Sequence, residues 1–125
     1  MVNFEVYIKG ILEQIDDSYT LLQNLRDKPG DLEIIKRETA KITGLLQALA
    51  NKFVTNKDDL SDYQHLVVPT RTYLNNYDFF REIDTMALLY SDDVLRLKNL
   101  RLTILDALSE RNLIEHIKAT LRENS

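Results

Sequence analysis

Few imidazole and no thiolate ligands are available for a metal, because the 125-residue sequence has two histidines and no cysteine. Asp62 lies three residues before His65, which is the spacing of one half of a helical di-iron motif. The second half would need a carboxylate three residues before His116, and Leu113 occupies that position. We therefore predict no metal site, and we interpret Asp62 and His65 as the exposed start of a helix.

Two pairs of carboxylates have a spacing that places both members on one side of a helix: Glu13 with Asp16, and Asp59 with Asp62. All-helical nucleotide pyrophosphohydrolases hold magnesium with such pairs on adjacent helices, since magnesium prefers oxygen ligands. The second pair is more typical of a helix cap, however, and the first flanks Ile15, which belongs to an apolar stripe. We expect solvated carboxylates, and a metal-dependent helical enzyme is the alternative.

His116 could accept a phosphoryl group, because helical bundles can carry phosphoaccepting histidines. Its segment, "EHIKATL", bears a superficial similarity to the histidine phosphotransfer domain. That domain has Lys three residues after the histidine, followed by Gly. Here Lys118 comes two residues after His116, and Ala119 stands in place of the Gly. We therefore expect a solvated histidine and keep phosphotransfer as an alternative function.

Other catalytic and nucleic-acid-binding patterns are missing from the sequence. It has no Gly-rich phosphate loop, no cysteine nucleophile and no convincing Ser-His-Asp constellation. The net charge of −4 argues against nucleic acid as a partner. Several basic residues lie near aromatics, namely Arg71, Arg81, Arg96, Lys98 and Arg101. Acidic residues interrupt them, so they form no continuous basic stripe. A helical nucleic-acid-associated regulator is therefore the third choice of function. We predict no enzyme activity and no cofactor.

The composition indicates one all-α domain over residues 1–125. Hydrophobic residues make up 44% of the chain, enough for a core, and three Gly and two Pro leave little room for turn-rich β structure. The longest uncharged stretch, Ile42 to Asn51, is far shorter than the ~20 residues of a membrane-spanning helix. Glu5, Glu13 and Asp16 interrupt any apolar leader. We expect a soluble, cytoplasmic protein without membrane insertion.

An antiparallel αα-hairpin is predicted over residues 3–56. Apolar residues recur three and four apart in two segments, which indicates one apolar face on each of two helices. The segment "DKPGD" separates them, because Pro29 cannot continue a helix and Gly30 tolerates turn geometry. The two faces consist of Phe4, Ile8, Ile11, Ile15, Ser18, Leu22 and Leu25, and of Leu32, Ile35, Thr39, Ile42, Leu46, Leu49 and Phe53.

The rest of the chain predicts further helices, which complete a bundle of five to six. Pro69 disfavours helical angles at Val68, so we expect a break or kink there, with Thr70 capping the next helix. Ser91, followed by two aspartates, is a strong helix start. The expected helix caps are Asn3, Asp31, Asp58 or Asp59, Thr70, Ser91 and Asn112. The expected helices cover residues of about 58–67, 70–90, 92–111 and 113–123.

The stretch 73–90 holds five of the ten aromatic residues, more than one packing face can use. A core role is the default for such residues. The alternative is an interface, where Tyr, Phe, Met and Arg are enriched. The expected partner-binding residues are Tyr73, Tyr77, Phe79, Arg81 and Met86.

The helix over 92–111 is apolar nearly all round, so it is either central in the bundle or covered by a partner. Together with the aromatic stretch, it favours a non-enzymatic protein-interaction module. Such a module would be an adaptor, a regulator or inhibitor, or a chaperone of a larger protein. Its partner would be another protein or a second copy of the chain.

Overall fold

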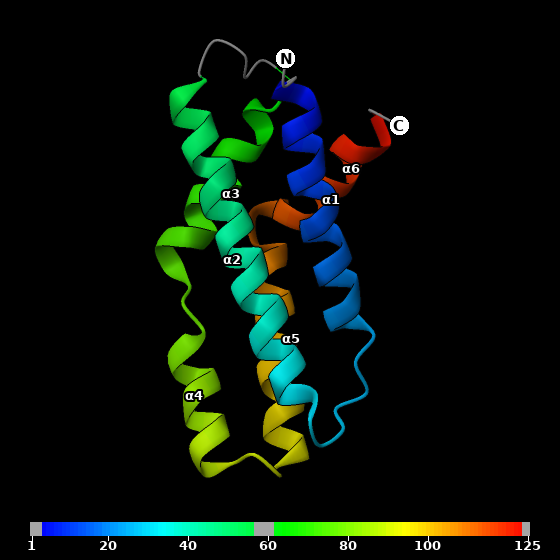
Figure 1. The fold of residues 1–125 in the computed structure, drawn as a ribbon, viewed down its shortest axis with the longest axis vertical. Coiled ribbons are helices and arrows are strands. Elements are labelled where there is room, and N and C mark those ends of the chain that lie inside the picture. Colours follow the sequence, from blue (N-terminus) through cyan, green and yellow to red (C-terminus); the bar gives the residue numbers. More distant parts are fainter. Residues whose placement is uncertain (1–3, 57–61, 124–125) are drawn as a thin grey trace.

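The structure is a computed structural model that describes residues 4–56 and 62–123. Its regular secondary structure in these residues is helical, without strands, so the prediction of an all-α bundle of five to six helices is confirmed (Figure 1). The elements are α1 (Phe4–Gln23), α2 (Asp31–Thr55), α3 (Gln64–Asn76), α4 (Phe80–Leu89), α5 (Val94–Ser109), a 3-10 turn η2 (Glu110–Asn112) and α6 (Leu113–Glu123).

The predicted N-terminal helix pair is present, and the two apolar faces meet between α1 and α2. Ile8 and Ile15 of α1 and Ile42 of α2 are completely buried in this contact. Ser18 interrupts the apolar face because it hydrogen-bonds a buried carboxylate of α2: its hydroxyl donates to Glu38 Oε1 at 2.8 Å. The hairpin therefore has an apolar seam with one polar link across it.

The carboxylate of Glu38 can be buried because each of its two oxygens accepts a hydrogen bond. Arg37 Nε donates to Glu38 Oε2 at 2.7 Å, while Ser18 holds the other oxygen. Burial alone would raise the pKa of this carboxyl group, but the hydrogen bonds from Arg37 and Ser18 outweigh it and lower the pKa.

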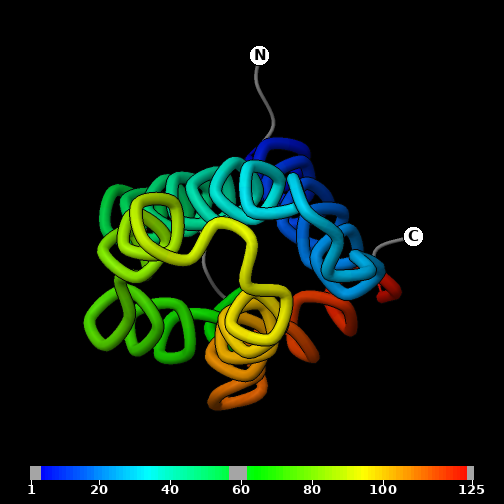
Figure 2. Tube along the Cα trace, turned by 90° about the horizontal axis from the view of Figure 1, so that it is seen from below, coloured from blue at the N-terminus to red at the C-terminus, as the bar shows by residue number. Residues whose placement is uncertain are grey.

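The other helices pack around this hairpin from two sides (Figure 2). The helices α3 and α4 follow one another along α2, whereas α6 lies beside α1. The helix α5 contacts both members of the hairpin as well as α4 and α6. All six α-helices contribute side chains to one hydrophobic core.

Of the break or kink predicted at Val68, the break is wrong, because α3 runs through Pro69. A proline inside a helix removes one backbone hydrogen bond and costs about 3 kcal/mol. The face that contains Pro69, with Leu66 and Tyr73, is buried in the core and offsets this cost. Thr70 is therefore a completely buried residue in the middle of a helix and not the expected cap.

The predicted single helix over 70–90 is also wrong, because the chain leaves helical geometry between α3 and α4. Tyr77 is extended, with φ −130° and ψ 135°. The carboxylate of Asp78 then accepts a hydrogen bond at 3.1 Å from the backbone amide of Phe80, the first residue of α4. An Asp side chain competes in this way with backbone hydrogen bonding and favours a break.

Two predicted helix caps are displaced by one or two residues. Gly30, at φ 96°, precedes α2, and Asp31 is the first residue of the helix. Asp93, and not Ser91, caps α5, since its Oδ1 accepts from the backbone amide three residues later at 3.1 Å. Three predicted caps lie outside the described residues, namely Asn3, Asp58 and Asp59.

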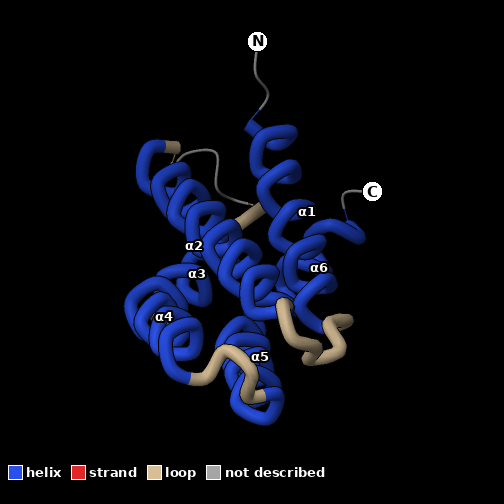
Figure 3. Tube along the Cα trace, turned by 60° about the horizontal axis from the view of Figure 1, so that its bottom comes forward, coloured by secondary structure: helices blue, strands red, loops and turns tan. Residues whose placement is uncertain are grey.

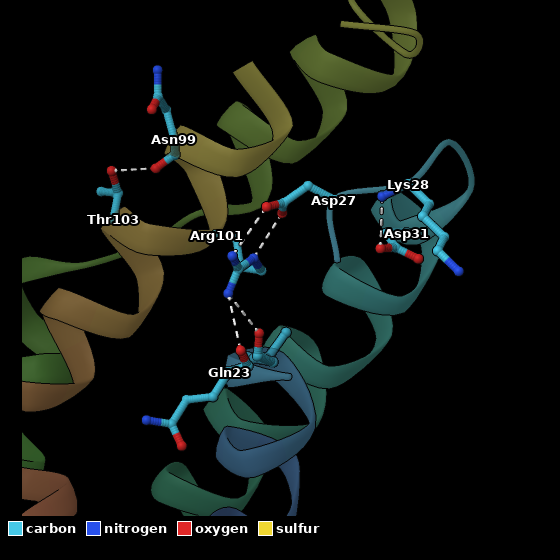
Figure 4. Close-up of polar contacts among 8 residues, drawn as sticks. Gln23, Asp27, Lys28, Asp31, Asn99, Arg101 and Thr103 are labelled. Atoms are coloured by element: carbon cyan, nitrogen blue, oxygen red, sulfur yellow. Dashed lines mark hydrogen bonds and ion pairs between the residues drawn. The ribbon is translucent and has the colours of Figure 1, made fainter. Parts of the chain in front are cut away.

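A buried arginine of α5 joins that helix to the hairpin (Figure 4). Arg101 is 8% exposed and forms a bidentate ion pair with Asp27, with Nε to Oδ1 at 2.8 Å and Nη2 to Oδ2 at 3.1 Å. Its Nη1 donates to the carbonyl oxygens of Leu22 at 3.1 Å and Gln23 at 3.3 Å. The guanidinium thus satisfies carbonyls at the C-terminal end of α1, and we call this set of contacts the Arg101 clamp.

We expect Asp27→Ala to lower the free energy of unfolding by about 3–5 kcal/mol, since it leaves a buried guanidinium unpaired. Urea denaturation measures the change. Asp17→Ala, at an exposed position of α1, is the matched control and is expected to change stability by less than about 0.5 kcal/mol. The clamp would be unimportant if both variants unfolded at the same urea concentration as the wild type.

We expect Ile42→Asp to abolish the folded state, because Ile42 is 0% exposed in the hairpin seam. A carboxylate in this apolar surrounding would be buried without a compensating partner. Circular dichroism should show no cooperative melt. Val54→Asp places the same charge on the exposed side of the same helix and should leave the melt nearly unchanged. A loss of less than about 1 kcal/mol for Ile42→Asp would mean that the seam is not core.

Candidate functional site

The five expected partner-binding residues fall into two groups in the structure. Tyr73, Phe79 and Met86 are buried within the chain, at 3%, 8% and 6% exposure. Tyr77 is half-buried, and Arg81 is exposed. The aromatic stretch is thus largely core in the isolated chain, which was the default interpretation of the sequence.

Three of the aromatic rings form a cluster at the break between α3 and α4. The Tyr73 and Tyr77 ring centroids are 5.5 Å apart, and Tyr77 stacks on Phe79 at 5.7 Å. The hydroxyl of Tyr77 donates to Glu110 of η2, and this hydrogen bond raises the pKa of Tyr77. Burial raises the pKa of Tyr73 to about 12. The cluster therefore ties the break to the end of α5, a structural role.

A groove lies between α4 and α5, which run side by side and are joined by a short connection (Figure 3). It has a volume of about 390 Å³. Buried Met86 and Leu100 contribute to its lining, so part of its surface is apolar. The residues that line this α4–α5 groove are Arg81, Glu82, Thr85 and Met86 of α4, Tyr90 of the connection, and Arg96, Asn99 and Leu100 of α5.

Arginines approach the α4–α5 groove from both walls. The Arg96 guanidinium lies 3.9 Å from the centroid of the Tyr90 ring, and its Nε pairs with Asp93 at 3.1 Å. Arg81 has no ion pair with any residue that the structure describes. The groove thus combines an apolar lining with guanidinium groups, a combination suited to an apolar ligand group with an anion beside it.

Exposed aliphatic side chains occur on the two helices that form the α4–α5 groove. Leu88, Leu89 and Leu95 are 83%, 69% and 68% exposed. On α4, Leu88 lies seven residues after Arg81, and on α5 Leu102 lies seven after Leu95, so each pair shares a face. We call the exposed set the α4–α5 apolar surface, and it consists of Leu88, Leu89, Val94, Leu95 and Leu102.

The sequence carried a partial signal for this surface. The helix over 92–111 was expected to be central or covered by a partner because it is apolar nearly all round, and Leu95 and Leu102 are part of that pattern. Leu88 and Leu89 were not among the expected partner-binding residues, which were chosen mainly from the aromatic residues of the same stretch. The position of the α3–α4 break decides which side of α4 faces outward, and the apolar periodicity did not reveal that break.

The two histidines lie in contact between α3 and α6, which the sequence analysis did not anticipate. The His65 and His116 ring centroids are 5.5 Å apart, in an edge-to-face arrangement at 69°. The hydroxyl of Thr120 donates to the carbonyl of His116 at 2.7 Å, so Nε2–H of His65 is the donor to Thr120 Oγ1 at 2.6 Å. The imidazoles thus form a packed pair.

The carboxylate pairs do not assemble a metal site in the part of the chain that the structure describes. Asp16 forms an ion pair with Lys118 of α6 at 3.0 Å, while Glu13 is exposed. Asp62 is exposed in a turn, and Asp59 lies outside the described residues. No group of three or more His, Asp or Glu side chains able to hold a metal occurs among the described residues.

Lys118 is engaged away from the His116 imidazole. Besides its ion pair with Asp16, its ammonium group lies 5.7 Å from the centroid of the Tyr19 ring. Both contacts join α6 to α1, so Lys118 serves to dock α6 onto the hairpin.

In comparisons with known proteins, no family model, no curated protein and no solved structure matches the chain. Within residues 4–56 and 62–123, none of the helices combines the length and apolar character needed to cross a membrane. The chain's own geometry therefore carries the functional argument.

We expect the stability of the fold to fall as pH drops below 6.5. Burial, followed by the charge of His116, lowers the pKa of His65 below 6.5, while Glu123 acts in the opposite direction. The unfolded chain then binds a proton at a higher pH than the folded chain, so protonation favours unfolding. Urea denaturation at pH 8 and pH 5 measures the difference, and NMR titration of the imidazole signals reports the pKa directly.

His116→Gln tests the cause of that pKa shift. Removing the neighbouring imidazole should raise the pKa of His65 toward 6.5 without restoring it fully, because burial is the larger cause. The stability of this variant should depend less on pH. An unchanged His65 titration in the variant would show that the two imidazoles do not interact.

Proposed function

We propose that this chain is a non-enzymatic protein-interaction module that binds its partner through the α4–α5 apolar surface. The observation that carries the proposal is the exposure of Leu88, Leu89 and Leu95 on the two helices that form a groove. Contiguous exposed apolar side chains with a polar rim are typical of protein-binding sites. The cellular role would be that of an adaptor, a regulator or inhibitor, or a chaperone of a larger protein.

Burial of the leucines supplies a driving force for association. Covering a Leu side chain completely contributes about 1.5–3 kcal/mol relative to leaving it exposed. The flanking positions on α4 and α5 suit a third helix lying along the groove, a common mode of peptide recognition. Arg96 and Tyr90, stacked at one end, are residue types that often dominate interface energetics.

The proposed contact set keeps part of the set expected from the sequence. Arg81 and Met86 line the groove, so both remain candidate partner contacts. Half-buried Tyr77 remains available only at its exposed edge. Tyr73 and Phe79 support the site from inside the core.

The proposal includes another protein or a second copy of the chain as partner, and it assigns the chain to the cytoplasm. A sequence without cysteine permits a reducing compartment. The net charge of −4 does not favour nucleic acid. No cofactor is proposed.

Affinity purification from the native cell tests the proposal when a double variant is compared with the wild type. A protein that binds the α4–α5 apolar surface should co-purify with the wild type and should be lost with Leu88→Ser and Leu95→Ser combined. Both leucines are more than half exposed, so the thermal melt of the variant should match that of the wild type.

The matched control combines Val6→Ser and Val54→Ser, which remove exposed aliphatic groups of α1 and α2. This control should retain the partner, and the purified partner should rebind the wild type in a reconstituted mixture. The proposal would be abandoned if the wild type carried no protein but a bound nucleotide or metal, or if both double variants bound equally well.

A further inference from the structure

The α4–α5 groove carries two arginines, although the net charge of the chain is −4. Arg81 belongs to α4 and Arg96 to α5, and Glu82 is the one acidic residue in the lining. Asp93, beside the groove, pairs with Arg96 through the Nε contact at 3.1 Å. Carboxylates of an occupant would pair with Arg81 and with the remaining donors of Arg96.

The contacts of Arg96 fix its orientation and leave donors available. Its guanidinium stacks over Tyr90 at 3.9 Å, and Asp93 binds its Nε edge. Its two terminal nitrogens make no hydrogen bond with the residues that the structure describes. Such a planar group can bind a carboxylate through two parallel hydrogen bonds.

Between the two arginines, the lining changes from charged to apolar. Met86 and Leu100 are buried and contribute to the groove, while Thr85 and Asn99 offer uncharged polar groups. An occupant that fits this lining has an apolar side chain that packs on Met86. It also has a carboxylate on either side of that apolar side chain.

We propose that the α4–α5 groove binds an amphipathic helix of another protein whose apolar anchor residues are flanked by Asp or Glu. This inference rests on the proposed function and deepens it by naming the class of partner segment. The leucines beside the groove cover the apolar face of that helix, and the two arginines select its acidic flanks.

Selection of helical peptides tests the inference with a defined probe. A displayed library that is random at the apolar and flanking positions of a helix is enriched on the wild-type protein. Labelled peptides from that pool are then measured by fluorescence anisotropy. We expect apolar anchors with neighbouring Asp or Glu, and binding about tenfold or more weaker to Arg81→Glu.

Arg71→Glu is the matched control, because Arg71 is an exposed arginine of α3 that does not line the groove. Its affinity for the selected peptides should equal that of the wild type, apart from a small long-range effect that added salt removes. The Met86 methyl signal in NMR spectra should shift when the peptide binds.

The outcomes separate this inference from the proposed function. Peptides that shift the Met86 signal but bind equally well to Arg81→Glu would refute the preference for acidic flanks. The groove would then remain the binding site of the proposed function. Peptides that bind without affecting Met86 would overturn the groove as the site. Self-association of the wild type that Arg81→Glu abolishes, measured by analytical ultracentrifugation, would make a second copy the occupant and overturn the inference.

Discussion

The Arg101 clamp is the contact on which the arrangement of the bundle depends. It joins α5 to the end of α1 and to Asp27 in the connection before α2, across 74 residues of sequence. A buried guanidinium is tolerated because carboxylate and carbonyl oxygens surround it, and the hydrogen bonds that it donates to Asp27 raise the pKa of Arg101. With α5 fixed in this way, its opposite side, which includes Arg96 and Asn99, is left to form the groove with α4.

The fold class and the hairpin could be predicted because they depend on local patterns. Spacings of three and four residues define the apolar faces of α1 and α2, and "DKPGD" marks the turn between them. The break between α3 and α4 was misplaced because tertiary burial overrides the local effect of Pro69. The real break follows from the side chain of Asp78, which apolar periodicity does not detect.

The candidate site was only partly predictable, because it depends on contacts between distant segments. Arg81 and Met86 were expected at an interface from their residue types, and both line the groove. The sequence could not show that Arg101 would be buried, since its carboxylate partner lies on another element. It also could not show which leucines stay uncovered, because exposure depends on how α4 and α5 pack against the hairpin.

Amide hydrogen exchange of the chain, alone and bound to the protein that co-purifies with it, is the most direct test of the α4–α5 surface as the interface. Amides that become buried or ordered at an interface exchange more slowly. We expect protection on binding to be concentrated in α4, in residues 90–93 and in the first half of α5. Protection concentrated instead in α1 and α6, around the histidine pair, would contradict the assignment of the α4–α5 surface as the interface.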